Sequence, residues 1–575
     1  MLKLAAFLKP YRKECILGPA FKLLEAILEL LLPTIMALII NNGVNLHDRA
    51  YVLKMGGLML LMALLGFGSS MICQYYAART SQGFGTTLRN SIFSHISSLS
   101  YAEIDRFGTP SLINRITNDV NQLQLAVAML IRLVIRAPFI CIGAVIMAML
   151  LDFKLSLVLM AAVPVFTVAI YIIINKTSPL YRKYQQKLDM LALMIRENLS
   201  GVRVIRAFAK SAAEKRRFDT FNDDLTDTAL FVGKISALLN PLTSLVMNAA
   251  IIAILWAGGF HINAGRLSQG EIIAFVNYMT QILLALIVVS NLVIIFTRAS
   301  ASARRVNEVL SATTSVPENA VPFLKDETAP AIVFRNVSFR YSSTGDTALA
   351  DVSVAIGTGE TVGVIGSTGS GKSTFVNLIP RFYDAGKGEI LVHGVNVKDY
   401  SLGQLREEIG VVPQKALLFT GTVAENIRWG KQNATEEEVV EAARLAQAHE
   451  FIVKLPDGYN SRVSQGGSNF SGGQRQRLTI ARALVSQPRI LILDDSSSAL
   501  DFATDAALRQ ALKQGPGNMT VLIVSQRASS IKHADKIIVL DDGCIADTGT
   551  HHSLMKSCET YREICLSQLS GEEAL

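Results

Sequence analysis

Six apolar segments, each long enough to cross a membrane as a helix, occupy the first half of this 575-residue chain. A helix needs roughly 20 residues to span a hydrocarbon layer of about 30 Å. Because the number of segments is even, both ends of such a bundle lie on the same side of the bilayer. The sequence therefore predicts an α-helical membrane bundle of six transmembrane helices. The apolar segments lie near residues 15–40, 53–78, 126–150, 155–176, 240–262 and 272–297.

The positive charge of the chain is concentrated in its apolar part. Residues 1–330 hold 31 Lys and Arg against 20 Asp and Glu, whereas residues 331–575 hold 24 against 27. Positive residues at the cytoplasmic ends of spans give this distribution, while a nucleic-acid surface needs a clustered basic stripe in a soluble domain. We therefore expect a lipid bilayer around the first part of the chain and no nucleic-acid partner.

The first span begins behind a basic flank, residues 3–13, which predicts a cytoplasmic N-terminus. Its apolar run is too long for a secretory signal and contains Lys22, Glu25 and Glu29, so we expect an uncleaved span. Six spans then also leave the C-terminus in the cytoplasm. The expected location is the cell (inner or cytoplasmic) membrane, as a multi-pass protein.

The connections between the spans differ in length. Residues 79–125 and 177–239 form two long connections that are polar and rich in helix formers, with apolar residues at helical spacing. We expect the spans to continue through them as helices well beyond the bilayer. The short connections are residues 41–52, 151–154 and 263–271.

Charged and amide side chains within the spans have two interpretations. They can line a polar cavity or a substrate path, or they can lie where helices leave the lipid and tie neighbouring helices together. The sequence leaves both interpretations open. The charged residues are Lys22, Glu25, Glu29, Arg132 and Arg136, and the amides are Asn240, Asn248, Asn277, Gln281 and Asn291.

The composition changes after the last span. Residues 311–330 contain three prolines and scattered acidic residues, which is typical of a linker. Short β-rich runs then alternate with helical patterns, which is typical of an α/β nucleotide-binding domain. We therefore predict a transmembrane domain at residues 1–315, a linker at 316–330 and an α/β P-loop domain at 331–575.

A glycine-rich loop between a strand and a helix carries the strongest chemical signal. Residues Gly366–Ser373 (GSTGSGKS) fit the pattern G-x-x-x-x-G-K-[ST] directly after the strand-like TVGVIG. In such a phosphate loop the backbone N–H groups turn toward phosphates, Lys372 reaches the β and γ phosphates of ATP, and the Ser373 hydroxyl binds Mg²⁺. Asp494, after the strand-like RILIL, is the carboxylate expected in the Mg²⁺ shell. The residues predicted to contact ATP here are Gly366, Ser367, Thr368, Gly369, Ser370, Gly371, Lys372, Ser373 and Thr374.

A second motif, Asn469–Arg477 (NFSGGQRQR), resembles the signature sequence of ATP-binding cassette (ABC) proteins. With it the entire chain resembles the exporter-type ABC half-transporters, in which six spans are fused to one cassette, including subunits of heterodimeric bacterial multidrug exporters. The resemblance implies ATP-driven outward transport of small amphipathic substrates such as drugs, lipids or peptides. It also implies a second ABC half-transporter as partner, because two cassettes of this family enclose each ATP between them.

The resemblance assigns roles to further residues. Tyr341 would stack on adenine, and Gln414 in VVPQ would sense Mg²⁺ and the γ-phosphate. Residues 498–501 would cross the dimer interface, and helices within residues 101–111 and 212–221 would couple the long connections to the cassettes. The signature residues that would contact the ATP of the partner chain, at a helix start rich in hydrogen-bond donors, are Ser471, Gly472, Gly473 and Gln474.

Two positions depart from the pattern of the family at the hydrolytic site. Asp495 stands where most members have Glu to polarise the attacking water, and Gln526 stands where they have the switch histidine. The Asp carboxylate is one methylene shorter, and an amide cannot carry a proton. We therefore expect weak hydrolysis at this chain's own site and a heterodimer in which its signature serves ATP bound by the partner. The predicted catalytic residues are Lys372, Gln414, Asp495 and Gln526.

A further departure is Ser461–Gly467 (SRVSQGG), which lacks the acidic residues that the family often has there. Its expected contacts with coupling helices therefore stay open. Two alternatives for the function also stay open. One is a regulatory or channel-like ABC protein whose inert site holds ATP as a clamp, and the other is an importer built on the exporter fold.

Overall fold

The computed structural model describes residues 2–265, 267–318, 326, 328–341, 345–514 and 518–568. The chain forms two compact units. The membrane unit comprises Met1–Ser97 and Pro110–Ser311, and the cassette unit comprises Ser98–Thr109 and Ala312–Leu575. Part of the predicted linker, residues 319–325 and 327, lies outside the described residues.

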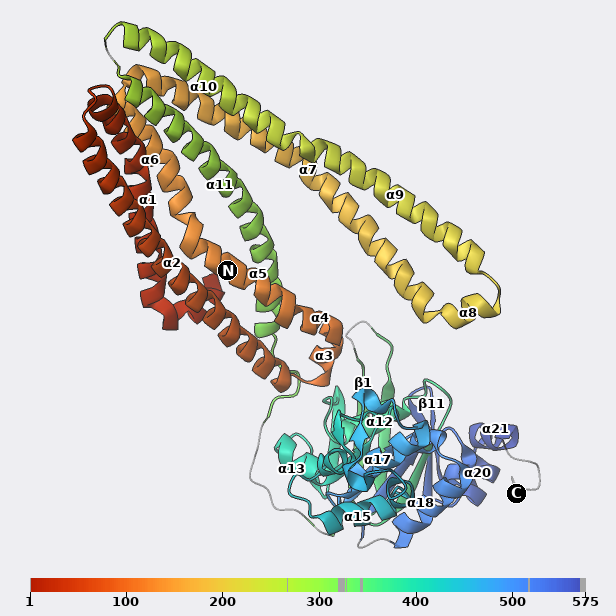
Figure 1. Ribbon diagram of the computed structural model, residues 1–575. Coiled ribbons are helices and arrows are strands. Elements are labelled where there is room, and N and C mark those ends of the chain that lie inside the picture. Colours follow the sequence, from red (N-terminus) through yellow and green to blue (C-terminus); the bar gives the residue numbers. More distant parts are fainter. Residues whose placement is uncertain are drawn as a thin grey trace. The chain divides into compact units, whose positions relative to one another are not determined.

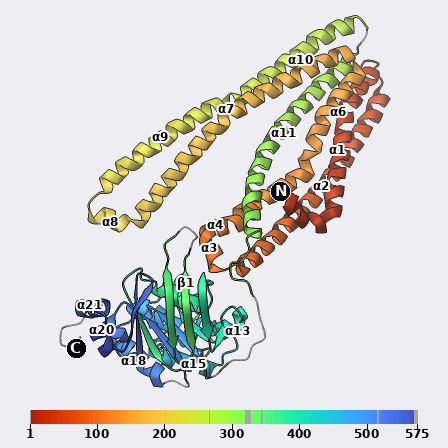
Figure 2. The same ribbon diagram turned by 180° about the vertical axis from the view of Figure 1, so that it is seen from behind.

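The membrane unit consists of helices that are long and apolar enough to cross a bilayer six times, as predicted. Figures 1 and 2 show them as a bundle in which α7 runs along α10 and α9, and α11 packs beside α6 and α1. In chain order the helical segments are η1 (Leu2–Tyr11), α1 (Arg12–Leu38), η2 (Ile39–Val44), α2 (Arg49–Ser98), α4 (Thr109–Asn114), η3 (Arg115–Asp119), α5 (Val120–Met129), η4 (Leu130–Val134), α6 (Arg136–Leu151), α7 (Phe153–Ser200), α8 (Val202–Ala207), α9 (Ser211–Ala237), α10 (Leu239–Asn263) and α11 (Gln269–Leu310).

The long connections are helical, as predicted, because α2 and α7 extend over 50 and 48 residues, far beyond the length that a bilayer requires. The second predicted coupling segment is helical, and its contact with a cassette stays a prediction. Residues 212–221 lie inside the long helix α9, and the short helix at the turn is α8. The chain reverses at Gly201 and at Ala209, which has a left-handed φ of 53°. The charged run after residue 211 is rich in helix formers and simply continues the next helix.

Four of the five charged side chains named in the spans form two ion pairs. Lys22 Nζ lies 2.7 Å from a carboxylate oxygen of Glu25 on the same helix, and Arg136 Nη2 lies 2.6 Å from Glu29 Oε2 on α1. Gln281 of α11 donates to the carbonyl oxygen of Glu29 at 3.4 Å. Glu29, Arg136 and Gln281 line a small cavity whose other walls are apolar. Glu29, Arg136 and Gln281 therefore both tie helices together and line a cavity.

The cassette unit is built on a six-stranded sheet of order β12-β11-β3-β10-β9-β6, in which β11 and β12 are antiparallel and the other neighbours are parallel. A four-stranded antiparallel sheet of order β2-β1-β4-β5 packs in a second hydrophobic core. The α/β prediction is confirmed. The strands are β1 (Ile332–Phe339), β2 (Leu349–Ile356), β3 (Thr361–Ile365), β4 (Lys387–Val392), β5 (Val395–Asn396), β6 (Ile409–Val412), β7 (Gly421–Thr422), β8 (Arg462–Val463), β9 (Ile490–Asp494), β10 (Thr520–Val524), β11 (Lys536–Asp541) and β12 (Cys544–Gly549).

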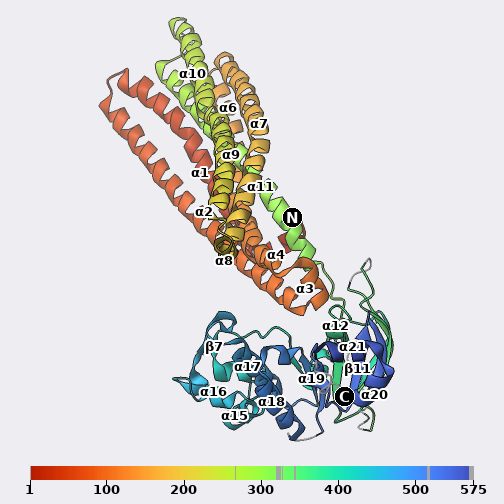
Figure 3. The same cartoon turned by 90° about the vertical axis from the view of Figure 1, so that its right-hand side faces the viewer.

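The parallel strands β3, β10 and β9 are neighbours, so their carboxyl ends meet at one edge of the sheet. All five residues of β9 and of β10 are buried, which fixes the positions of the loops that follow them. Figure 3 shows the helical part around α15, α16 and α17 beside the sheets of the same unit. The helices are α12 (Lys372–Leu378), α13 (Leu402–Glu407), α14 (Val423–Arg428), α15 (Glu436–Leu445), α16 (His449–Ile452), α17 (Gly472–Leu484), α18 (Phe502–Gln514), α19 (Ala528–Ile531), α20 (His551–Ser557) and α21 (Glu559–Gln568).

The first long connection contributes helix α3 (Tyr101–Phe107) to the cassette unit, which confirms the contact expected of this coupling segment. The Tyr101 ring lies 4.7 Å from the Phe382 ring, measured between centroids. The Tyr383 hydroxyl donates to Asp105 Oδ2 at 2.8 Å. Burial, together with this carboxylate, raises the pKa of Tyr383 above its ordinary value, so the hydroxyl remains a donor at neutral pH.

Candidate functional site

The phosphate loop connects β3 to α12 in a conformation that requires glycine. Gly369 and Gly371 have left-handed φ values of 89° and 94°. A Cβ atom on Gly366 would lie 2.1 Å from the Leu540 carbonyl oxygen, and one on Gly371 would lie 2.6 Å from that of Ala348. The glycine pattern seen in the sequence is therefore a steric requirement of this tight turn.

Lys372 stands at the first position of α12 with its side chain folded toward its own loop. Its Nζ donates to the carbonyl oxygens of Gly366 at 2.9 Å and Ser367 at 2.6 Å. Burial lowers the pKa of Lys372, and the charges of Asp494 and Asp495 act in the opposite direction. The ammonium group is thus held beside the loop, where it can neutralise a phosphate.

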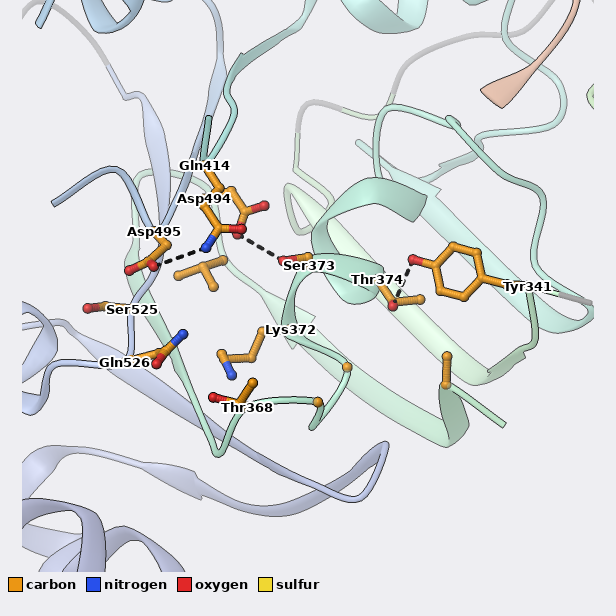
Figure 4. A pocket seen from close by; sticks show the side chains of 14 residues that line it. Tyr341, Thr368, Lys372, Ser373, Thr374, Gln414, Asp494, Asp495, Ser525 and Gln526 are labelled. Carbon is orange, nitrogen blue, oxygen red and sulfur yellow. Dashed lines mark hydrogen bonds between the residues drawn. The ribbon is translucent and has the colours of Figure 1, made fainter. Parts of the chain in front are cut away.

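Two carboxylates follow at the end of β9. Ser373 donates its hydroxyl to Asp494 Oδ1 at 3.3 Å, and Gln414 Nε2 donates to Asp495 Oδ2 at 3.4 Å. Figure 4 shows both hydrogen-bonded pairs above Lys372 in the view. Asp495 and Gln526 lie to the left of Lys372, and Thr374 and Tyr341 lie to its right. Asp495 has a left-handed φ of 46°, and its N–H donates to the Val524 carbonyl at 3.0 Å, which fixes where its short side chain begins.

The two carboxylates are both harder to ionise than an ordinary Asp. Burial raises the pKa of Asp494, the Ser373 hydroxyl lowers it, and the charge of Asp495 raises it again. Burial also raises the pKa of Asp495, against the hydrogen bond from Gln414 and the charge of Arg527. A divalent cation would favour the ionised form of both groups.

These groups line one pocket of about 380 Å³. Ser525, at the end of β10, was missed by the sequence reasoning, although its place after a strand beside β9 was a usable signal. Gly366, Ser367 and Ser370 belong to the phosphate loop but not to the described lining of the pocket. Their oxygen atoms accept hydrogen bonds from Lys372 Nζ. The lining residues are Tyr341, Ala348, Thr368, Gly369, Gly371, Lys372, Ser373, Thr374, Gln414, Asp494, Asp495, Val524, Ser525 and Gln526.

Tyr341 closes one end of the pocket. Its hydroxyl lies 3.0 Å from the Thr374 hydroxyl, and the residue is 53% exposed. Phe339 and Tyr383 meet this ring edge to face, at interplanar angles of 85° and 86°. The neighbours therefore orient the ring and leave about half of its surface for another flat group.

The signature residues lie at another place in the cassette unit, at the start of α17. Ser471 is the N-cap: its hydroxyl accepts from Gln474 N at 3.3 Å, and its own N–H donates to Gln474 Oε1 at 2.9 Å. Ser471, Gly472, Gly473 and Gln474 do not occur in the described lining of the phosphate-loop pocket. The side chain of Gln474 caps the helix, and a Cβ atom on Gly472 would meet open space.

The loops that follow β9 and β10 are joined to each other. Ser498 donates its hydroxyl to the Asp495 carbonyl at 2.8 Å, and Arg527 donates to the Ser498 carbonyl at 3.4 Å.

In the Ser461–Gly467 segment, Arg462 and Val463 form β8, which pairs with β7. The missing acidic side chains therefore do not disturb the local fold there.

The donor set of the pocket fits a Mg²⁺ ion. Mg²⁺ prefers oxygen ligands and is held in nucleotide sites by one or two protein groups together with the phosphates. Ser373 and Asp494 supply a hydroxyl and a carboxylate, and Gln414 supplies an amide oxygen nearby. Among the described residues there is no group of three His, Cys, Asp or Glu that would hold a metal ion without such phosphates.

Comparisons with known proteins agree with both units. A sequence profile described as ABC transporter transmembrane region matches residues 15–286, and one described as ABC transporter matches residues 349–498. An uncharacterized ABC transporter ATP-binding protein of Mycobacterium tuberculosis is 40% identical over 98% of this chain and 97% of its own length. A putative multidrug export ATP-binding/permease protein of Bacillus subtilis is 33% identical over 98% of each chain. The structure of a bacterial Atm1-family ABC exporter with ATP bound has the same fold, with a TM-score of 0.79 and 24% identity over 97% of this chain and 98% of that one.

Proposed function

This chain belongs to the ABC transporter family, and we propose that it is the subunit with the weaker hydrolytic site in a heterodimeric exporter. It is an exporter-type half-transporter that joins a membrane domain to an ATP-hydrolysing cassette. Its domains are residues 1–315 and 331–575, joined by a linker. It resides in the cell membrane with both termini in the cytoplasm and moves small amphipathic molecules outward.

Each ATP is held between two chains in this proposal. The phosphate loop of one chain grips the triphosphate, and the signature of the other completes the site. The position of Ser471 to Gln474 outside the described pocket of the same chain supports this arrangement. So does the tip of the second long connection, where Val204 and Phe208 of the α8 turn are 60% and 72% exposed. Apolar side chains at a cytoplasmic tip favour a contact with a second chain.

The residues of the pocket bind the nucleotide, hold Mg²⁺ and act at the γ-phosphate in this proposal. Lys372 and the loop N–H groups bind the phosphates, and Tyr341 stacks on adenine. Ser373, Asp494 and Gln414 hold Mg²⁺, which supplies charge neutralisation when bound. Asp495, which accepts a hydrogen bond from Gln414, would orient the attacking water, and Gln526 would face the γ-phosphate.

The observation that carries the proposal of a weak site is the pairing of a short carboxylate with an amide. A positioning group displaced by about 1 Å costs on the order of a hundredfold in rate. The Asp495 main chain is held by the hydrogen bond from its N–H to the Val524 carbonyl, so its carboxylate lies one methylene closer to the main chain than that of a Glu would. Gln526 offers a hydrogen bond but neither a proton nor a positive charge.

The test is the ATPase rate of the purified full-length chain in lipid nanodiscs. The wild type is expected to hydrolyse ATP slowly, and the double variant Asp495→Glu, Gln526→His is expected to be roughly a hundredfold faster. Asp494→Asn added to that double variant serves as the control and should abolish the gain. A fast wild-type homodimer, or a restored variant that gains nothing, would refute the weak site.

Direction and pairing need separate measurements. Flux of a fluorescent amphipathic dye against its gradient in liposomes distinguishes a pump from a channel-like protein. The direction of that flux distinguishes an exporter from an importer.

Copurification of a second half-transporter with the chain from native membranes tests the heterodimer. A homodimer with full transport activity would contradict it.

A further inference from the structure

The side chain of Gln568, the last residue of α21, is bound to the main chain of the loop after β10. Its Nε2 donates to the Gln526 carbonyl oxygen at 2.8 Å, and its Oε1 accepts from the Ala528 N–H at 2.9 Å. Both distances are those of good hydrogen bonds. One amide therefore holds the backbone on both sides of Arg527, immediately beside a residue that lines the nucleotide pocket.

The helix that carries Gln568 is firmly anchored. Tyr561 and Cys565 of α21 are fully buried and belong to the same hydrophobic core as Ala528 and Ile531 of α19. The Tyr561 hydroxyl lies 2.8 Å from His551 Nδ1 of α20. Because α21 and α19 share this core, the amide acts from a fixed position and not from a mobile tail.

The orientation of the Gln526–Arg527 peptide decides where two side chains point. Gln526 turns into the pocket. Arg527 turns toward the loop after β9, where it donates to the Ser498 carbonyl oxygen at 3.4 Å. The Arg527 N–H is itself bound to Ser525 Oγ at 2.9 Å. A rotation of this peptide would therefore withdraw the Gln526 side chain from the pocket and Arg527 from the Ser498 carbonyl oxygen.

We propose that Gln568 is a positioning residue for the γ-phosphate end of the nucleotide pocket and that the C-terminal helix thereby sets how well this chain distinguishes ATP from ADP. The inference rests on the proposed function of Gln526 as the group that faces the γ-phosphate. Gln568 acts through the backbone of that residue and does not touch the nucleotide. The amide is needed because the loop presents one acceptor and one donor to it.

The experiment measures the dissociation constants of Mg-ATP and Mg-ADP for the full-length chain in nanodiscs, by displacement of a fluorescent nucleotide. Gln568→Ala is expected to reduce the preference for ATP over ADP about fivefold, somewhat less than the loss of a whole hydrogen bond to a charged group, with little change in ADP affinity. Gln568→Glu keeps the acceptor for Ala528 but sets a carboxylate oxygen against the Gln526 carbonyl oxygen, so a reduction at least as large as that of Gln568→Ala is expected. Hydrogen exchange at the Ala528 amide should be faster in Gln568→Ala.

The matched control is Ser567→Ala, an exposed neighbour whose hydroxyl bonds to the Ile564 carbonyl of its own helix. It should leave both dissociation constants and the Ala528 exchange rate unchanged. In a Gln526→Ala background, Gln568→Ala should add nothing to the loss of ATP preference. A Gln526→Ala variant that keeps its ATP preference would overturn the proposed function of Gln526. If Gln526→Ala loses the preference while Gln568→Ala keeps it, or if the two losses add, the positioning function is wrong.

Discussion

The two surfaces of the cassette unit that are proposed to meet ATP differ in how they are built. At the phosphate-loop pocket, groups from distant segments come together, and two of their pairs are long: 3.3 Å from Ser373 to Asp494 and 3.4 Å from Gln414 to Asp495. At the signature, Ser471 and Gln474 cap the same helix within four residues of each other. The signature is therefore a local structure, whereas the pocket depends on the relative positions of several loops.

Under the proposed function, this difference explains how one chain would keep one half-site and weaken the other. A missing methylene at Asp495, or an amide in place of an imidazole ring at position 526, changes the hydrolytic groups without disturbing β9 or β10, whose residues stay buried. A substitution in the capping pair of the signature would also destabilise the fold, because the loss of an N-cap costs about 1 kcal/mol. The stability of the fold therefore constrains the signature residues more strongly than it constrains the hydrolytic residues.

The largest expected effect separates the two surfaces directly. Lys372→Ala removes the ammonium from the phosphate loop and should weaken Mg-ATP binding to this chain about a hundredfold. Gly472→Glu should leave that binding unchanged, because a side chain at Gly472 meets open space in this chain. It should lower the ATPase rate of the assembled transporter by about two to three orders of magnitude, since the added charge faces the partner's triphosphate.

The measurements are nucleotide affinity of the chain alone and ATPase rate of the assembled pair. Gly472→Ala is the matched control, and its neutral methyl should cost much less than the carboxylate. If Gly472→Glu weakened this chain's own nucleotide binding as strongly as Lys372→Ala, the two surfaces would belong to one site, and the comparison would fail.

The sequence predicted the local features best. The phosphate loop and the signature were predictable because glycine spacing and capping residues determine backbone geometry within a few residues. Six spans were predictable from length and hydropathy. The turn at α8 was not predicted, because it depends on a left-handed Ala209, and Ala carries no signal for that conformation. The hydrogen bonds of Gln568 were not predictable, because they join residues about 40 positions apart through main-chain atoms that have no sequence pattern.

A smaller effect concerns the pH dependence of the phosphate-loop pocket. The pKa of Asp494 is raised from its ordinary 3.8, chiefly by burial, so the folded chain binds this proton more tightly than the unfolded chain does. The stability that this protonation contributes is fully present below the ordinary pKa and is lost as pH rises through the raised one. Without Mg²⁺, the unfolding midpoint of the wild type minus that of Asp494→Asn should therefore fall with rising pH across this window.

Thermal unfolding in detergent between about pH 4 and pH 8 checks this sign. The matched control is Asp501→Asn, at the outer end of the Ser498–Asp501 segment. Hydrogen bonds from Thr504 lower the pKa of Asp501, so its midpoint difference should rise with pH where that of Asp494 falls. Equal slopes for the two variants would contradict the buried environment assigned to Asp494.

The smallest effect tests whether the pocket contains a stacking surface that the signature lacks. Tyr341 is oriented edge to face by Phe339 and Tyr383 and is bound through its hydroxyl to Thr374 at 3.0 Å. Tyr341→Phe keeps the ring, so Mg-ATP affinity should change by less than about twofold, whereas Tyr341→Ala should weaken it about fivefold, which corresponds to roughly 1 kcal/mol of aromatic stacking. GTP should lose affinity to a similar degree, because stacking tolerates any base. A Phe variant as weak as the Ala variant would show that the hydroxyl, and not the ring, holds the nucleotide, and adenine stacking by Tyr341 would then be wrong.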